Sequence, residues 1–457
     1  MKIKRLAFGI LILSLLACNY VAQMVFPPTA TALPTSTPTA SPTSTPEPLA
    51  PAFIPPECAT TPLATISPET ASQPAPAFET VEISQGEQMR ILRELANIVR
   101  DVYVYPDFNG KDWNEIEARY KEKIESGLDT DSFYREMDAM IRELGDEHSR
   151  FLSPVQVEES DAELKGEIEF VGVGLMWQLD VEREHMVVIS TYPGSPAEYA
   201  GIQQHDSILL VDGLPINEAI GNRLHGPKCS ALVLTVQSPG EAPRDVMLIR
   251  YAIHGNIPID ARLISTTDGS KIGYIFIPSF FDETLPGQIK NALNEFGQLD
   301  GLILDVRLNG GGSSSVTYPI LEYFANGRLG EFISRSDSRP LTIEPNPIQN
   351  SQTVPLIVMV SKDTASFGEI FAGMLKDSGR AKVVGETSLG NVEVLHRYDF
   401  EDGSQLWIAS ERFDSAFSDA NWEETGIIPD VQAYAEWDTF YFDTDPSIAA
   451  ALDLLGH

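Results

Sequence analysis

The chain has 457 residues, and 43% of them are hydrophobic, which is enough to bury a sizeable core in more than one compact unit. The formal net charge is −34. No stretch gathers lysine and arginine into a basic stripe, so nucleic acid is excluded as an expected partner. The acidity indicates a well-solvated surface and does not identify a substrate.

The first eighteen residues have the pattern of a targeting segment. A positive start, "MKIKR", precedes the apolar run "LAFGILILSLLA", which is too short to cross a bilayer as an ordinary transmembrane helix. The run ends in "LLAC", so residues 1–18 resemble a bacterial lipoprotein signal in which Cys18 becomes the lipidated first residue. The alternative is a plain secretory signal with an incidental cysteine. The lipoprotein interpretation predicts an extracytoplasmic protein that is lipid-anchored to a bacterial membrane.

Residues 19–83 have the composition of a linker. Proline, threonine, serine and alanine dominate, with no apolar period, so this segment is expected to stay disordered and to act as a stalk. The chain has two cysteines beyond Cys18, namely Cys58 and Cys229. Outside the cytoplasm they could pair, but Cys58 lies in the expected stalk, and the sequence predicts no pairing.

Residues 84–157 are expected to form a helical region. Ser84 and Glu87 have the spacing of a capping box, and apolar residues then recur at helical spacing from Met89 to Val102. Two further helical windows follow, the second ending at Gly145. The loop after it, "DEHSRFLSP", places His148 directly beyond a helix end, where a side chain can be directed at a site.

Residues 158–255 change to short β-rich runs separated by Gly and Pro turns. The run "GSPAEYAGIQQHDSILLVDG" resembles a PDZ domain, with His205 where that family usually has glycine. In a PDZ domain the "GVGL" stretch would be the carboxylate-binding loop, because its backbone N–H groups converge on a peptide C-terminus. The peptide-binding residues that this resemblance implies are Gly172, Val173, Gly174 and Leu175.

From residue 256 to residue 457 the pattern is α/β. The runs "KIGYIFIPSF", "DGLILDVRL", "PLIVMV" and "AKVVGE" predict strands, and "TLPGQIKNALNEF" and "FGEIFAGMLKDSG" predict helices between them. Strands that alternate with helices indicate a sheet with helices packed on its faces.

Three blocks in this region, "LDVRLNGGG", "SKDTASFGEIFAGMLKDSGRAKVVGE" and "WEETGIIPDV", match in order the signature of the C-terminal processing, or tail-specific, proteases. That serine peptidase family includes the tricorn protease. The resemblance covers residues 84–457, with the PDZ-like segment in the expected place. It implies a mixed α/β protease core with an inserted β-rich PDZ domain and an N-terminal helical region.

The resemblance assigns the nucleophile to Ser366, which follows a buried strand and opens a helix, where developing negative charge is favoured. The alternative is that Ser366 only caps the helix. The glycine stretch would supply one oxyanion-hole N–H, from Gly311 or Gly312, and Phe367 another. A simple flexible turn is the alternative for the glycines.

The proton acceptor departs from the common pattern. Most members of the family use a lysine about 25 residues after the serine, and Asn391 stands there in this chain. An amide cannot act as the base. Lys376 and Lys382 lie outside the motif. The tricorn branch uses a distant histidine and a late glutamate, which implies His148 as base and Glu423 as the acid that orients it. The alternative is that neither has this role, because members with a lysine base have similar histidine loops and an acid at the same place, and Glu424 is adjacent.

Asp377 matches a further carboxylate of the family and is expected to support structure. The sequence predicts no metal site and no cofactor, and no pattern fixes an oligomeric state. The expected function is a serine endopeptidase that cleaves unfolded or tail-exposed proteins, whose C-termini the PDZ domain captures. A catalytically silent, peptide-binding lipoprotein and a small-ligand binder on the same fold are the alternatives.

Overall fold

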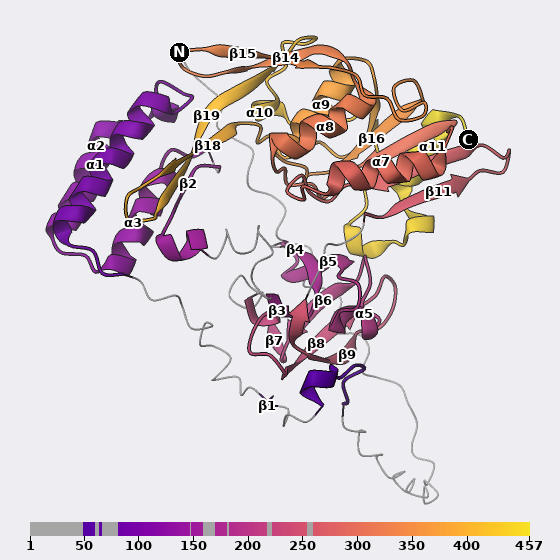
Figure 1. Cartoon of the computed structure of the whole chain (residues 1–457), viewed down its shortest axis with the longest axis horizontal. Coiled ribbons are helices and arrows are strands. Elements are labelled where there is room, and N and C mark those ends of the chain that lie inside the picture. The colour runs from indigo at the N-terminus through magenta and orange to yellow at the C-terminus, as the bar shows by residue number, and fades with distance from the viewer. Residues whose placement is uncertain are drawn as a thin grey trace, which may run out of the picture. The chain divides into compact units, whose positions relative to one another are not determined.

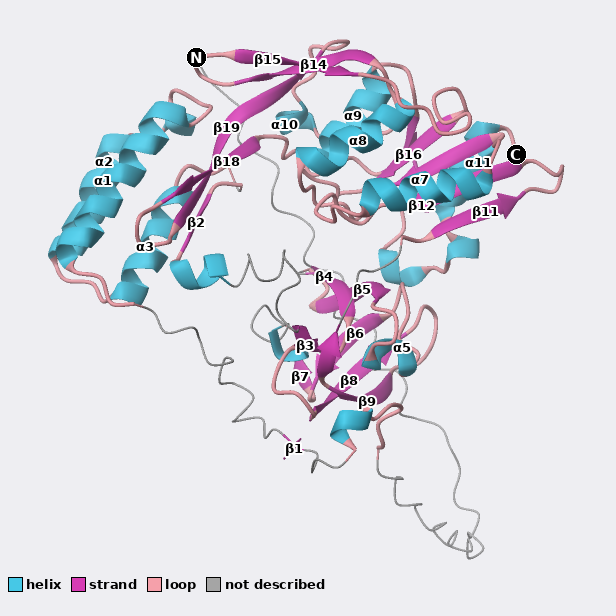
Figure 2. Ribbon diagram, in the orientation of Figure 1, coloured by secondary structure: helices cyan, strands magenta, loops and turns pink. Residues whose placement is uncertain are grey.

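The computed structural model describes residues 49–59, 64–65, 81–146, 148–158, 170–180, 182–216, 222–253 and 259–457. The predicted lipid-attachment residue, Cys18, lies outside the described residues. Among those that are described, no helix has the length and apolar character needed to cross a membrane. Figures 1 and 2 give the elements by position in the chain and by type.

Three helices follow residue 84, as predicted: α1 (Gln85–Val102), α2 (Trp113–Glu125) and α3 (Thr130–Arg142). Ser84 and Glu87 form the expected capping box at the start of α1. The buried face of α1 is centred on Ile91, Leu95 and Val99. Met89, where the predicted apolar face begins, is only half-buried, so the observed face is rotated from the predicted one. These helices share a hydrophobic core with one end of a five-stranded sheet.

That sheet has the strand order β15-β14-β19-β18, and β2 pairs with β19. Its strands are β2 (Arg150–Leu152), β14 (Gly327–Ile333), β15 (Ser338–Ile343), β18 (Val394–Asp399) and β19 (Gln405–Ser415). All of its pairings are antiparallel. Because β19 pairs with both β2 and β18, it holds the segments that precede these two strands near each other.

A six-stranded sheet with the order β11-β12-β13-β16-β17-β20 forms the centre of the α/β region. It contains β11 (Ala261–Ser265), β12 (Lys271–Phe276), β13 (Gly301–Asp305), β16 (Leu356–Val360), β17 (Lys382–Gly385) and β20 (Val431–Gln432). All its pairs are parallel except β11 with β12. The four strands predicted from residues 271–386 are therefore present and adjacent.

Helices cover both faces of this sheet. Side chains that alternate along β13 and β16 divide between two cores, as expected for buried parallel strands. One core contains α7 (Leu285–Phe296), α8 (Ser314–Phe324) and α9 (Phe367–Asp377), which group together in Figure 2. The other contains α11 (Pro446–Leu455). The mixed α/β fold expected from the sequence is confirmed.

Residues 170–253 form a β-rich unit. Its main sheet has the order β1-β8-β6-β5-β4, with β7 and β9 attached. The strands are β1 (Ala64–Thr65), β4 (Leu175–Asp180), β5 (His185–Thr191), β6 (Ser207–Val211), β7 (Leu214–Pro215), β8 (Ser230–Gln237) and β9 (Arg244–Ile249), and a separate pair joins β3 (Phe170–Gly172) to β10 (Tyr251–Ile253). A one-turn helix, α5 (Pro196–Tyr199), follows β5.

His205, where the sequence analysis expected a glycine, has a positive φ of 74°. Its imidazole is buried, and Nδ1 lies 2.7 Å from the carbonyl oxygen of Trp437. The ring also packs against the rings of Trp437 and Phe440. These contacts hold a side chain in a left-handed position that normally favours glycine.

Part of the expected stalk is folded, which differs from the prediction of disorder across residues 19–83. Cys58 and Cys229 form a disulfide with a Cα–Cα distance of 5.3 Å. The Phe53 ring stacks on Tyr199 at 4.2 Å, and Lys228 pairs with Glu57 at 2.6 Å. These contacts attach the described residues around Cys58 to the β-rich unit, and the cysteine pair that the sequence could not decide is joined.

Candidate active site

Ser366 occupies a strained position between β16 and α9. Its φ of 53° and ψ of −127° lie in a region that residues other than glycine rarely adopt. It is the residue before α9, yet its side chain makes no capping hydrogen bond. The backbone N–H of Ser366 donates to the carbonyl oxygen of Asn391 at 2.8 Å. A residue that served only as a cap would need neither this strain nor an unused hydroxyl.

The glycine stretch lies directly against Ser366. A Cβ added at Gly311 would lie 3.0 Å from Ser366 Oγ and 3.2 Å from the backbone nitrogen of Phe367. Gly311 N–H donates to Asn309 Oδ1 at 2.8 Å, so it is already satisfied. Within the described residues, the N–H groups of Gly312 and Phe367 have no acceptor. Of the two candidate glycines, Gly312 therefore has the available donor.

Glu369 fixes the loop that approaches Ser366. Its buried carboxylate accepts hydrogen bonds from Ser388 Oγ at 2.6 Å, from Gly390 N–H at 2.7 Å and from Asn391 N–H at 2.8 Å. Burial raises the pKa of Glu369, and these donors act against that rise. The loop, and Asn391 within it, is thereby held to the first turn of α9.

The next two lysines after Ser366 in the sequence lie away from it. Lys376 is in the last turn of α9, and its ammonium group donates to the carbonyl oxygen of Ile428. It lies ten residues along the helix from Ser366, which corresponds to about 15 Å. Lys382 is exposed and pairs with Asp430 at 3.3 Å. Asp377, at the end of α9, accepts a hydrogen bond from Ser418.

His148 is placed by the loop between α3 and β2. Asp146 accepts hydrogen bonds from the N–H groups of His148 at 3.1 Å and Ser149 at 2.8 Å. The hydroxyl of Ser149 in turn accepts from Ala409 N–H, on β19, at 3.0 Å. The imidazole is largely buried, with 14% of the side chain exposed. In the described chain, no hydrogen bond joins His148 to Ser366.

The partner of His148 is Glu393, a residue that the sequence analysis did not select. His148 Nδ1 lies 3.5 Å from Glu393 Oε2, and only 1% of the Glu393 side chain is exposed. Tyr105 donates its hydroxyl to Glu393 Oε1 at 2.8 Å. Glu393 is two residues beyond Asn391, whose carbonyl binds Ser366, so this short segment brings His148 and Ser366 into one neighbourhood.

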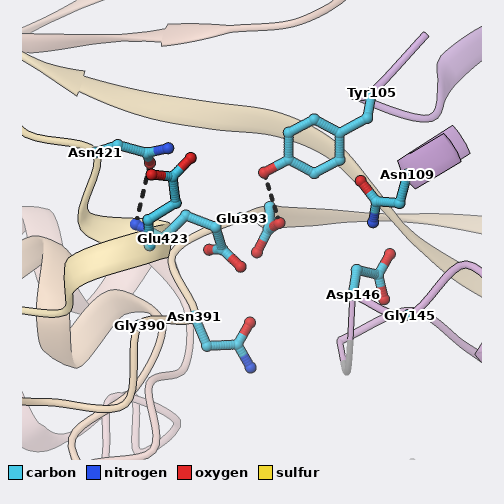
Figure 3. A pocket seen from close by; sticks show the side chains of 10 residues that line it. Tyr105, Asn109, Gly145, Asp146, Gly390, Asn391, Glu393, Asn421 and Glu423 are labelled. Atoms are coloured by element: carbon cyan, nitrogen blue, oxygen red, sulfur yellow. Dashed lines mark hydrogen bonds between the residues drawn. The ribbon is translucent and has the colours of Figure 1, made fainter. Parts of the chain in front are cut away.

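Glu423 faces Glu393 and has no recorded contact with His148 in the described structure (Figure 3). Glu423 Oε2 accepts a hydrogen bond from Val392 N–H at 2.7 Å. Burial, hydrogen bonding to Glu393 and its negative charge raise the pKa of Glu423 to about 9. Burial alone would also raise the pKa of Glu393, but its interactions with His148, Glu423 and the Tyr105 hydroxyl hold it below its usual value. Of the two acids, Glu423 is therefore the one that holds a proton more readily.

A polar cavity of about 400 Å³ lies beside this cluster (Figure 3). Its lining includes Tyr105, Asp146, Asn391, Glu393 and Glu423. Among the described residues, no group of three potential metal-binding side chains is arranged to hold an ion. Asn391, which stands where a lysine was expected, therefore lines the same cavity as the acids Glu393 and Glu423.

The four residues of the predicted carboxylate-binding loop lie together at one end of the β-rich unit. Gly172 pairs with Tyr251, and Leu175 begins β4, the last strand in its sheet order. The carbonyls of Val173 and Gly174 accept from the N–H groups of Ala197 and Tyr192, both at 3.0 Å. A Cβ at Gly174 would lie 2.2 Å from Ser195 Cβ, so only glycine fits there.

The site contains three functional candidates that pattern analysis missed: Glu369, Glu393 and Tyr105. Glu369 did carry a signal, since it is a charged residue in an otherwise apolar helix start, "FGEIFAG". Glu393 and Tyr105 are separated by 288 residues. Their meeting depends on the pairing of distant strands, which no local pattern reveals.

Comparison with known proteins shows which family the chain is similar to. The model of peptidase family S41 matches residues 271–433, and that of the tricorn protease C1 domain matches residues 85–142. A carboxyl-terminal-processing protease of Picosynechococcus sp. is 31% identical over 394 residues, covering 82% of this chain and 90% of that protein. Its counterpart in Synechocystis sp. is 28% identical over 382 residues, covering 81% and 87%.

Among solved structures, a photosystem II D1 C-terminal processing protease superposes with a TM-score of 0.57 at 27% identity, covering 76% of this chain and 94% of that one. The chain belongs to the carboxyl-terminal-processing proteases of peptidase family S41, and is thus a serine-type peptidase by family. The family predicted from the three sequence blocks is confirmed.

Proposed function

We propose that this chain is an active serine endopeptidase in which Ser366 is the nucleophile and His148 the general base. The observation that carries the proposal is the state of Ser366: an uncapped hydroxyl on a strained residue at a helix N-terminus, beside Gly311 and the N–H of Phe367. Strain of this kind costs on the order of 1–3 kcal/mol and is concentrated at functional sites.

In the proposed reaction, Ser366 Oγ attacks the substrate carbonyl while its proton passes to His148. The N–H groups of Phe367 and Gly312 stabilise the oxyanion, and the positive end of α9 adds to this field. His148 then donates the proton to the leaving amine. Water, deprotonated by His148, hydrolyses the acyl-enzyme and restores Ser366. In this scheme Glu423 and Glu393 form the acidic cluster beside His148.

The direct test is cleavage of a disordered polypeptide by the wild type and by Ser366→Ala. We expect the wild type to cleave and the variant to be inactive, because no other group replaces the hydroxyl. The competing function is a silent peptide-binding relative, which the amide of Asn391 in the lysine position favours. Equal cleavage by both proteins would refute the nucleophile, and no cleavage by either would favour the silent relative.

We further propose that the β-rich unit captures the substrate C-terminus at Gly172–Leu175. The support is a glycine-containing loop leading into β4, whose outer edge has no strand partner among the described residues. A peptide could therefore add as a strand, with its carboxylate at the loop. Amidation of the peptide's C-terminus should weaken binding markedly. Equal affinity for the acid and the amide would refute this part of the proposal.

We also propose that Cys18 is lipidated and anchors the enzyme at the outer side of a bacterial membrane. The support is the "LLAC" sequence followed by the Pro/Thr-rich tract. Cys18→Ser should either release the protein from the membrane fraction or leave an unprocessed precursor. Normal processing with unchanged membrane retention in that variant would contradict the anchor.

A further inference from the structure

The contact between His148 and Glu393 joins two buried atoms that lack any other hydrogen-bond partner. Within the described residues, His148 Nδ1 and Glu393 Oε2 are both buried and neither makes a normal hydrogen bond. They lie 3.5 Å apart, slightly beyond the usual hydrogen-bond range. Leaving such buried polar atoms unpaired destabilises the folded state. Pairing of an imidazole N–H with the carboxylate satisfies both atoms.

Glu393 is also the better placed of the two acids to orient His148. Its other oxygen is fixed by Tyr105, and its side chain is almost completely buried. Glu423 instead accepts from Val392 N–H and faces Glu393 (Figure 3). The order of contacts is therefore His148, Glu393 and Glu423.

We propose that Glu393 is the positioning residue for His148, and that a proton held on Glu423 keeps Glu393 as the carboxylate. The Glu393 carboxylate accepts Nδ1–H, which fixes the imidazole tautomer and leaves Nε2 as the nitrogen that takes the proton of Ser366. Two carboxylates in contact cannot both stay ionised, so the proton on Glu423 bonds to Glu393 and removes the repulsion. This inference rests on the proposed function and names a residue that neither the sequence blocks nor the comparisons assign.

Three groups face Glu393, each from a different element, and each bears on its charge. They are His148 before β2, Tyr105 after α1 and Glu423 in α10 (Trp422–Thr425). Glu369 acts on the cluster more remotely, through Glu423. Substitution of Glu393 by glutamine preserves its size and removes its charge, so the effect on His148 can be separated from a loss of packing.

The test measures the rate at which a fluorophosphonate labels Ser366 as a function of pH, in the wild type, Glu393→Gln and Glu423→Gln. Loss of an orienting acid from a serine protease triad costs roughly 10,000-fold. Because the contact here is longer, we expect Glu393→Gln to slow labelling by on the order of 100-fold. The pH dependence of labelling should also change, because the charge beside His148 is removed. Glu423→Gln, which retains a donor to Glu393, should lose less.

Glu295→Gln, an exposed change in α7, is the matched control and should label at the wild-type rate. An unchanged profile in Glu393→Gln, or a larger loss in Glu423→Gln, would overturn the inference. If Glu393→Gln does not fold, Tyr105→Phe removes one donor to Glu393 and should slow labelling several-fold, and no slowing would count against the inference. Failure of the wild type to label, or labelling of Ser366→Ala, would instead refute the proposed function.

Discussion

The backbone N–H of Ser366 donates to the carbonyl oxygen of Asn391 at 2.8 Å. Asn391, which stands where the sequence analysis expected a lysine, is therefore bound to Ser366 through its main chain. Its amide side chain lines the cavity beside Glu393 and Glu423. An amide is not basic, so in the proposed mechanism the base that takes the proton of Ser366 comes from elsewhere in the chain.

Asn391→Lys tests this conclusion. A lysine placed there would meet the acids of the cavity, which favour its charged, non-basic form. It would also compete with His148 for Glu393. We expect labelling of Ser366 by a fluorophosphonate to become slower, not faster. A clear gain over an inert parent would show that the chain is a silenced lysine-type enzyme.

Gly311→Ala should inactivate the enzyme without unfolding it. Gly311 has φ of 103°, and the added Cβ would lie 2.6 Å from Ser366 Cβ, beside the Phe367 N–H. Because the oxyanion would bind in that space, we expect turnover to fall by on the order of 100-fold or more.

The control for Gly311→Ala is Gly379→Ala, just beyond α9. Gly379 also has a positive φ, of 72°, but a Cβ there would meet no atom within 4 Å. Gly379→Ala should lower the melting temperature, because of backbone strain, and leave turnover unchanged. Equal turnover in both variants would refute a role for the space beside Gly311.

The disulfide should stabilise the protein. Cys58 and Cys229 are separated by 171 residues, and closing a loop of that length removes at most about 5 kcal/mol of unfolded-state entropy. Cys58→Ser, Cys229→Ser and the double variant should therefore show the same fall in melting temperature, since each removes the same bond. If the double variant is clearly less stable than either single variant, the cysteines act separately and the bond does not account for the loss.

Stability should decrease as the pH rises through the range in which Glu423 ionises. The pKa of Glu423 is raised to about 9, so the folded state holds this proton more tightly than the unfolded state does. Its contribution to the free energy of unfolding is complete below the ordinary carboxyl pKa and is lost as the pH rises towards 9. Glu423→Gln should flatten this decline in melting temperatures. If the melting temperatures of the wild type and Glu423→Gln fall in parallel as the pH rises, the prediction is wrong.

The sequence predicted those parts of the fold that have strong local signals. The capping box at Ser84 places the start of α1, and short apolar runs place β12, β13, β16 and β17. The sheet that contains β14, β15, β18 and β19 was not predicted. Its strands carry charged and polar residues and are partly exposed, so they lack the continuous apolar runs of the buried parallel strands.

The candidate site divides in the same way. Ser366, Gly311 and Phe367 belong to contiguous motifs, and the structure brings them together. His148 could be nominated from its loop, but its partner could not, because His148 and Glu393 meet only when β2 and β18 both pair with β19. The register of strands so distant in sequence is a tertiary property.

The most direct measurement is the rate at which a fluorophosphonate labels Ser366 in the wild type and in His148→Ala, with Ser366→Ala as the blank. Labelling requires a serine hydroxyl whose proton can be removed, and general-base catalysis contributes roughly 100- to 10,000-fold. We expect the wild type to label at Ser366 and His148→Ala to label at least 100-fold more slowly. If the wild type labels and His148→Ala labels at the same rate, the assignment of His148 as the base is contradicted.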